Sequence, residues 1–213
     1  MTGKKMRPSR PRIVISRTQT ILLALVMAAL SIFSISCHAP RSASLPDGPL
    51  THRPQPVLRA NDLERKIHML INRERGKHDL SLLAGNDVLA RIARGHSKDM
   101  ASRRYFSHDS PEGHDFSFRY RQEGYTCSLR IGNTIHKGAE NIFQNVRFNS
   151  VTTVNGEAYY DWNSEEQIAE TTVRGWMDSP GHRKNILTPH WRSEGIGVFL
   201  SPDDKIYITQ NFC

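Results

Sequence analysis

The chain closes with Gly195-Ile-Gly-Val-Phe-Leu200, the turn Ser201-Pro-Asp-Asp204, and Ile206-Tyr-Ile-Thr-Gln-Asn-Phe212. Two runs rich in β-formers on either side of a Pro/Asp turn predict an antiparallel hairpin. The patterns upstream of this hairpin are mainly helical, without the regular alternation of strand and helix that predicts a parallel sheet. Helices that come first and strands that come last indicate an α+β layered fold.

Helical patterns fill much of the chain before the hairpin. The first predicted helix is capped by Asn61 or Asp62 and ends near Gly76, and the second begins after Asn86-Asp87. The second has an apolar face made of Leu89, Ile92, Ala93, His96 and Met100, so His96 is expected to be a core residue rather than a ligand.

Two further helices and an insertion complete the pattern. A short helix is predicted from Asp115 to Glu123, where Gly124 stops it. The stretch 144–162 is polar and β-branched, and it is read as an inserted loop or hairpin. Ser164-Glu-Glu-Gln167 is a capping box that opens the last helix, and Pro180-Gly181 should end it.

The amino-acid composition indicates a globular protein. The 213 residues are 38% hydrophobic and 23% charged, which suits one globular domain with an appendage. The 29 Lys and Arg exceed the 21 Asp and Glu, but six of these cations lie in the first 17 residues. The rest of the chain therefore has 23 cations and 21 acids, a net charge of +2. This small charge gives no reason to expect a nucleic-acid partner.

The N-terminal segment is predicted to direct export. The apolar run Ile21–Ile35 follows the six cations, as in a secretory signal. Residues 1–37 are therefore a cleaved signal peptide, a lipoprotein signal or a retained membrane anchor. Ser34-Ile-Ser-Cys37 resembles a bacterial lipobox, so a lipid on Cys37 is one route to the membrane. The protein is expected in the cell envelope, as a lipoprotein or anchored to the membrane, or secreted.

The remaining cysteines and prolines fit export. Residues 38–60 contain repeated prolines and form a predicted linker, which leaves 61–213 as the folded domain. If Cys37 is acylated or removed, Cys127 and Cys213 remain. In an oxidising compartment these two would most simply form a disulfide bond, and the alternative is two free thiols.

Motifs of the common enzymes are missing from the sequence. It contains no HExxH, GxSxG, P-loop or GxGxxG pattern. Three polar clusters lie within otherwise structural sequence instead. They are Phe106-Ser-His-Asp-Ser110, Gly138-Ala-Glu-Asn-Ile142 and Trp176-Met-Asp-Ser-Pro-Gly-His-Arg-Lys-Asn-Ile-Leu187.

In order and type these clusters resemble the bacterial branch of the CAP superfamily, which comprises cysteine-rich secretory proteins, antigen 5 and plant pathogenesis-related 1 proteins. Further matches are Ile71-Asn-Arg-Glu74, His96-Ser-Lys-Asp-Met100, Gly195-Ile-Gly-Val198 and the closing strand. The resemblance covers about Asp62 to Phe212. It implies a three-layer α-β-α sandwich (CAP/SCP-like) with a surface cleft.

The resemblance also implies where the site lies. Many members line the cleft with two histidines and two acids. His108 and His182 match the histidines and Glu140 matches one acid, while Ser179 stands where the second acid is expected. Because the set of four is incomplete, the resemblance does not carry over a four-residue catalytic mechanism.

The residue types indicate a metal site as one possibility. Two neutral imidazoles with an open face can hold Zn²⁺ or another divalent cation. Glu140 would be a third ligand, an acceptor that orients an imidazole, or a base acting on water. The alternatives are structural: both histidines hydrogen-bond backbone groups, Glu140 only accepts amide protons or pairs with Arg183, and Ser179 only ends a helix.

Three functions remain open on these residues. The first is a binding module whose cleft takes a divalent metal and an unidentified small ligand, lipid, glycan or peptide. The second is a peptidase-like hydrolase that uses Ser179, His182 and Glu140 or a metal-activated water. The third is a structural envelope protein with a vestigial cleft. No nucleophile elbow or recognisable oxyanion hole accompanies the candidates, so the sequence favours binding over catalysis.

Overall fold

The computed structural model describes residues 54–213. The predicted signal or anchor at 1–37 and most of the predicted linker lie outside these residues. No helix within 54–213 combines the length and apolar character needed to span a bilayer. Leu58 of the predicted linker is buried against the main core, and the Gln55 amide donates to Asp204 Oδ1 at 3.1 Å. The described end of the linker therefore packs on the domain.

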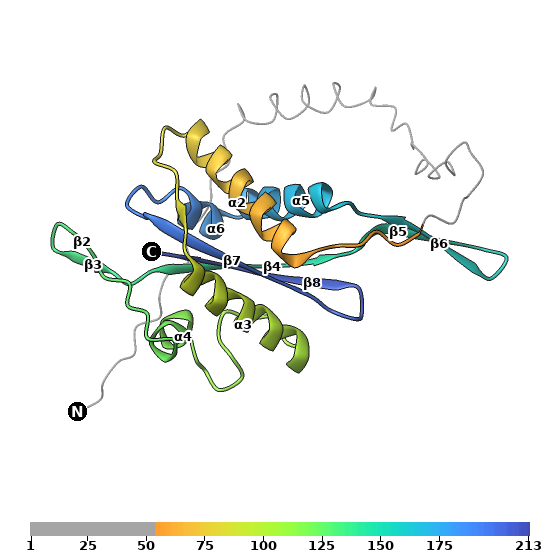
Figure 1. Ribbon diagram of the computed structural model, residues 1–213, viewed down its shortest axis with the longest axis horizontal. Helices are drawn as coiled ribbons and strands as arrows, with labels where there is room; N and C mark the ends of the chain where they lie inside the picture. The colour runs from red at the N-terminus through yellow and green to blue at the C-terminus, as the bar shows by residue number, and fades with distance from the viewer. Residues whose placement is uncertain (1–53) are drawn as a thin grey trace, which may run out of the picture. The chain divides into compact units, whose positions relative to one another are not determined.

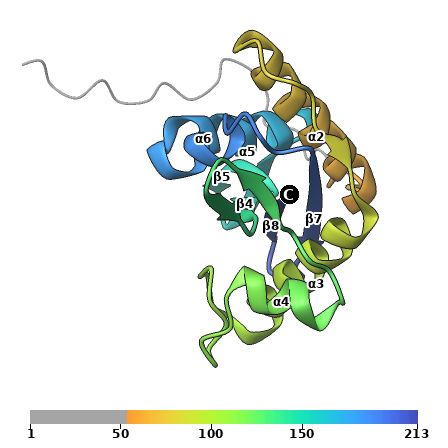
Figure 2. The ribbon, with the colours of Figure 1, turned by 90° about the vertical axis from the view of Figure 1, so that its left-hand side faces the viewer.

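The helices lie on both faces of a central sheet, as Figures 1 and 2 show. On one side are α2, α5 and α6, and on the other are α3 and α4, which gives the predicted three-layer α-β-α sandwich. The helices are α2 (Ala60–Lys77), α3 (Asp87–Arg103), α4 (Phe116–Gln122), α5 (Glu165–Asp178) and α6 (Pro180–Ile186).

The central sheet has the strand order β1-β7-β8-β4. Its strands are β1 (Ala84–Gly85), β4 (Ala139–Val146), β7 (Ser193–Leu200) and β8 (Lys205–Phe212). Strand β1 is parallel to β7 and the other pairs are antiparallel, so the predicted C-terminal hairpin is confirmed as β7–β8. Two small hairpins lie outside this sheet: β2 (Leu129–Ile131) with β3 (Thr134–His136), and β5 (Phe148–Val154) with β6 (Glu157–Trp162).

Local signals explain most helix boundaries. The Asn86 side chain accepts from the amides of Val88 and Leu89, which caps α3 as predicted. Ser164 and Gln167 form the predicted capping box of α5. The predicted cap of α2 is wrong, since Arg59 occupies the cap position and makes no side-chain cap bond.

The end of α5 holds an unpredicted element. The helix stops at Asp178, as Pro180-Gly181 predicted, but a new short helix, α6, begins at Pro180. Proline suits the first turn of a helix because its missing N–H has no partner there anyway. The same residue therefore ends one helix and begins the next, and His182 lies in the first turn of the second helix.

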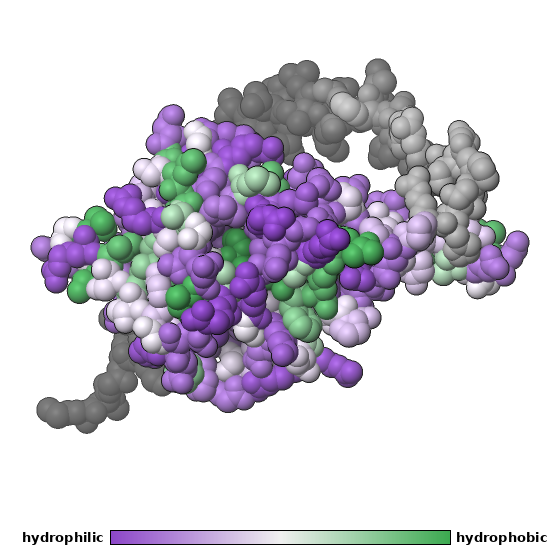
Figure 3. All heavy atoms as spheres, in the orientation of Figure 1, coloured by the Kyte–Doolittle hydropathy of each residue, from purple (hydrophilic) through white to green (hydrophobic). Residues whose placement is uncertain are grey.

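The core lies between the sheet and both helical layers. Leu63, Ile67, Ile168 and Trp176 are fully buried on one side of the sheet. On the other side α3 approaches β7 closely at Gly195, where an added Cβ would lie 2.1 Å from the Ala90 backbone nitrogen. On the face shown in Figure 3, hydrophilic side chains cover most of the described surface, and apolar ones form small, separate patches.

A disulfide joins Cys127 to the C-terminal residue Cys213. The predicted pairing is therefore confirmed. It links the segment between α4 and β2 to the end of β8, and so it fixes the loop region that precedes β4.

Candidate functional site

Glu140 is the second residue of β4 and its side chain is 1% exposed. Its Oε1 accepts from His108 Nδ1 at 3.0 Å, and its Oε2 accepts from Arg119 Nη2 at 2.7 Å. A carboxylate removed from water needs such partners, because an unpaired buried charge is strongly destabilising. Glu140 therefore has both oxygens engaged by side chains from the other helical layer.

His108 lies in the loop between α3 and α4, and half of its side-chain surface is exposed. Arg119 of α4 holds this loop, because its guanidinium donates to the carbonyls of His108 and His114, both at 2.9 Å. With Nδ1 donating to Glu140, the neutral ring carries its lone pair on Nε2. His108 therefore combines a fixed orientation with a free ligand or acceptor atom.

His182 comes from the opposite side of the sheet, in the first turn of α6. Its ring centroid lies 6.1 Å from that of His108, with the ring planes 51° apart. Burial, followed by the nearby His108, lowers the pKa of His182 below its ordinary value of 6.5. The imidazole is therefore neutral at pH 7, as a metal ligand must be.

Buried amide side chains fix β4 against α6. The Asn185 side chain donates to Glu140 O at 3.1 Å and to Asn141 Oδ1 at 2.9 Å. The Asn141 side chain in turn donates to His182 O at 3.3 Å and to Gln210 Oε1 at 2.9 Å. Because Asn141 and Gln210 are fully buried, these bonds hold the backbone of both site elements in one arrangement.

The structure thus brings His108, Glu140 and His182 together from a loop, a strand and a helix. Ser179 lies at the junction of α5 and α6, where its amide donates to Trp176 O and its carbonyl accepts from Arg183 N. These bonds are those of a helix junction, the structural role considered for Ser179.

Two other expectations can be compared with the structure. His96 is a core residue as predicted: it is 2% exposed and its Nε2 lies 3.0 Å from Ser107 O. Burial lowers the pKa of His96, so the ring is neutral. The ion pair considered between Glu140 and Arg183 does not form, since Arg119 occupies that place and Arg183 Nη2 lies 3.3 Å from His78 Nε2.

Arg119 is the site residue that sequence reasoning missed. It lies outside the three polar clusters, and only the fold places α4 beside β4. Glu140 itself is positioned by this ion pair, so any chemistry at the site depends on Arg119. Beside the pair, a cavity of about 210 Å³ is lined by His96 and Arg119.

The arrangement provides two candidate metal ligands, the imidazoles of His108 and His182. Among the residues that the structure describes, no three His, Cys, Asp or Glu side chains are grouped so as to hold a metal ion. The acid that would complete such a group is Glu140, and its oxygens are taken by Arg119 and His108.

Comparison with known proteins gives relatives in a bacterium, Bacillus subtilis. The chain is 33% identical over 149 residues to the membrane protein YlbC of Bacillus subtilis, a match that covers 70% of this chain and 34% of YlbC. It is 31% identical over 140 residues to YkwD of the same organism, with 65% of this chain and 43% of YkwD covered. The chain therefore matches less than half the length of these relatives.

Solved structures agree with the fold. An extracellular protein of Bacillus anthracis that contains an SCP domain superposes with a TM-score of 0.53 at 33% identity, over 72% of this chain and 40% of that protein. An outer surface protein of Borrelia burgdorferi has a TM-score of 0.54 at 14% identity, over 73% of this chain and 94% of that one, and this likeness supports the fold alone.

The family model for the cysteine-rich secretory proteins, CAP, matches residues 68–212. That range contains His108, Glu140 and His182 together with every strand of the central sheet. The chain belongs to the cysteine-rich secretory protein (CAP) family.

Proposed function

We propose that this chain is an exported CAP-domain protein that binds a divalent transition metal, such as Zn²⁺, through His108 and His182. The observation that carries the proposal is the pair of imidazoles 6.1 Å apart, one of them oriented by a buried carboxylate. In the proposal Glu140 holds His108 in place and is not itself a ligand.

Export is supported by three independent features. The N-terminal sequence has a basic run followed by an uncharged apolar run. The Cys127–Cys213 disulfide is typical of an oxidising compartment. The relatives include an extracellular protein and a membrane protein by their names. Whether Cys37 carries a lipid is part of the same proposal, and mass spectrometry of the mature N-terminus tests it.

The ring geometry fits a shared metal after a small adjustment. With Zn–N distances of about 2.0–2.1 Å, two imidazoles on one tetrahedral zinc have ring centres roughly 5 Å apart. The observed 6.1 Å therefore requires the rings to approach by about 1 Å. Glu140 orients His108, so rotation of the half-buried His182 side chain supplies this movement.

Glu140 has the role of an orienting group. A carboxylate that accepts from one imidazole nitrogen fixes the tautomer and raises the basicity of the other nitrogen. Arg119 and His108 each occupy one oxygen of Glu140, so neither oxygen is free to take a proton from water. This environment favours a metal-binding module over a hydrolase that uses Glu140 as its general base.

Zinc titration of the full-length chain by calorimetry tests the proposal. One equivalent of Zn²⁺ should bind with a dissociation constant on the order of micromolar, weaker than structural zinc sites because only two protein ligands contribute. His108→Gln and His182→Gln should each weaken binding at least tenfold. The control is His78→Gln, because His78 is exposed and lies outside the site. Unchanged zinc affinity in both site variants, or no zinc binding by the natural chain, would contradict the proposal.

A further inference from the structure

Strand β7 has an edge that is only partly covered. Ser193 and Cys213 exchange both backbone hydrogen bonds, so Ser193 turns its backbone groups toward β8. The N–H and C=O groups of successive residues point to alternate sides of a strand. Those of Glu194, Ile196 and Val198 therefore point away from β8. The bond from Asn86 N to Glu194 O, at 2.8 Å, agrees with this assignment.

Strand β1 covers only the beginning of that edge. It pairs with Ser193 and Glu194 and ends at Gly85, where the chain turns into α3. Farther along, the Val198 amide donates to Glu64 Oε1 at 3.0 Å instead of to a strand. Between these two points, no strand of residues 54–213 pairs with the outward N–H and C=O of Ile196.

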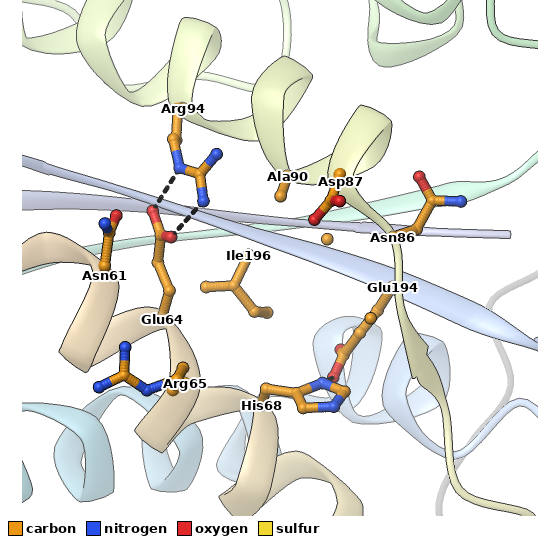
Figure 4. A pocket seen from close by; sticks show the side chains of 12 residues that line it. Asn61, Glu64, Arg65, His68, Asn86, Asp87, Ala90, Arg94, Glu194 and Ile196 are labelled. Carbon is orange, nitrogen blue, oxygen red and sulfur yellow. Dashed lines mark hydrogen bonds and ion pairs between the residues drawn. The ribbon is translucent and has the colours of Figure 1, made fainter.

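A cavity of about 230 Å³ lies at this uncovered position, between α2 and α3. Gly195 and Ile196 are among the residues that line it, and Figure 4 shows Ile196 at its centre. The cavity is separate from the site at Glu140, because β7 and β4 are kept apart by β8 in the sheet.

The acids deepest in this cavity are already paired. Glu64 accepts from Arg94 Nε at 2.9 Å and Nη2 at 2.6 Å in addition to the Val198 amide. Glu194 accepts from His68 Nδ1 at 2.6 Å, and Gln210 donates to its other oxygen at 2.5 Å. These groups shape the wall, and a ligand would have to compete with strong internal bonds to use them.

The charges nearer the rim are arranged by sign along the strand. Asp87 is exposed and lies at the end of the cavity where β1 stops (Figure 4). Arg94 lies toward the other end, and Arg65 lies below it in the same view. Arg94 uses Nε and Nη2 for Glu64, and Arg65, whose side chain is 70% exposed, uses Nη2 for Asp62, so each guanidinium keeps further N–H donors for a ligand. Along β7 from Glu194 toward Val198, the rim therefore runs from the carboxylate of Asp87 to the remaining guanidinium N–H donors of Arg94 and Arg65.

We propose that this groove binds a short extended peptide of two or three residues, which pairs with the backbone of Ile196 parallel to β7 and so continues the line of β1. In that direction its terminal ammonium lies near Asp87 and its terminal carboxylate near Arg94 and Arg65. Added strands gain affinity from main-chain hydrogen bonds. At about 3.3 Å per residue, the stretch from Ile196 to Val198 accommodates about two residues.

Nuclear magnetic resonance of the full-length, ¹⁵N-labelled chain tests this with L-Ala-L-Ala as the probe. The dipeptide should shift the Ile196 amide saturably. N-acetyl-L-Ala-L-Ala amide lacks both terminal charges and should bind at least tenfold more weakly, a comparison that leaves the protein unaltered. Asp87→Asn and Arg65→Gln should each weaken binding of the free dipeptide severalfold. Arg91→Gln is the matched control, because Arg91 lies on α3 and pairs with Glu123 instead.

Three results would overturn the proposal. The first is an Ile196 amide that does not move at dipeptide concentrations of tens of millimolar. The second is equal affinity for the free and blocked dipeptides, which would mean that the rim charges do not select the ligand. The third is a set of shifts confined to His108 and His182, which would place the peptide at the metal site.

Discussion

Two histidine–glutamate pairs lie on different strands of the same sheet, β4 and β7. In each, an imidazole Nδ1 meets a buried carboxylate: His108 with Glu140 on β4 at 3.0 Å, and His68 with Glu194 on β7 at 2.6 Å. The carboxylates are 1% and 0% exposed, respectively. In the second pair the other ring nitrogen is also in contact, because Nε2 of His68 lies 3.3 Å from Asn72 Nδ2.

The two pairs differ in the third partner of the carboxylate. Arg119 is a permanent cation, so Glu140 is neutralised whatever the state of its histidine. Glu194 has the neutral amide of Gln210 in that place. Its hydrogen bond to His68 raises the pKa of that histidine above the ordinary 6.5. The same pair of residue types therefore gives an imidazole oriented beside a neutralised carboxylate on β4 and a proton-retaining one on β7.

Removing Arg119 should abolish this difference between the two carboxylates, and we expect it to have the largest effect on stability. Arg119→Met leaves the buried Glu140 with His108 as its remaining hydrogen-bond partner, and losing one member of a buried pair costs about 3–5 kcal/mol. We expect the free energy of unfolding, measured with urea, to fall by about 3 kcal/mol. Arg121→Met, in the same helix but exposed, should change it by less than about 0.5 kcal/mol.

The double variant Arg119→Met/Glu140→Gln tests whether the lost stability comes from the unpaired charge of Glu140. Glutamine removes the charge that Arg119 compensates, so part of the lost stability should return. If the single variant unfolds like the natural chain, or if the added Glu140→Gln restores nothing, the ion pair does not hold the site.

Gln210 should show the next largest effect, because it lies on β8 between β7 and β4 and contacts side chains of both. Its amide donates to Glu194 and its oxygen accepts from Asn141, which contacts the backbone of His182. Gln210→Leu leaves buried polar groups without partners, so the unfolding free energy should fall by about 2 kcal/mol. Gln144→Leu on β4 is the control, since Gln144 is exposed. Equal stability of the two variants would contradict a structural role for the network.

His68 should give β7 a pH-dependent contribution to stability. Its pKa is higher in the folded than in the unfolded chain, so the folded state binds the proton more tightly. The contribution is complete below the unfolded pKa and is lost as pH rises through the folded pKa. At pH 5.5 we expect His68→Gln to cost about 1.5 kcal/mol of unfolding free energy, the lower end for a charged hydrogen bond, and much less at pH 9. A cost that does not change between these pH values would refute the charged pair with Glu194.

Features that depend on interactions between residues close in the sequence were predictable from the sequence. The capping box at Ser164 and the cap at Asn86 act within one helical turn, and the C-terminal hairpin follows from alternation around Ser201-Pro-Asp-Asp204. The clusters containing His108, Glu140 and His182 were recognisable because each forms a continuous motif. These features need no knowledge of the packing.

Features that depend on packing were not predictable in the same way. Arg119 reaches Glu140 only because α4 packs beside the start of β4, and no motif joins the two residues. His68 and Glu194 are 126 residues apart and meet only through the fold. The helix α6 was missed because Pro180 can both end one helix and begin another. Long-range charge partners are therefore the part of the site that requires a structure.

The smallest expected effect is the order in which His68 and His182 titrate. This order measures the difference between the two strands most directly. Burial lowers the pKa of His182, and the bond to Glu194 raises that of His68, so their midpoints should fall on opposite sides of 6.5. The ring Cε1–H signals of the full-length chain, assigned with His68→Gln and His182→Gln, report both midpoints. Added Zn²⁺ should broaden or shift the His182 signal and leave that of His68 in place, since only His182 faces a second imidazole. If His68 titrated first as pH rises, the bond to Glu194 would not hold its proton, and the two pairs would be equivalent despite their different third partners.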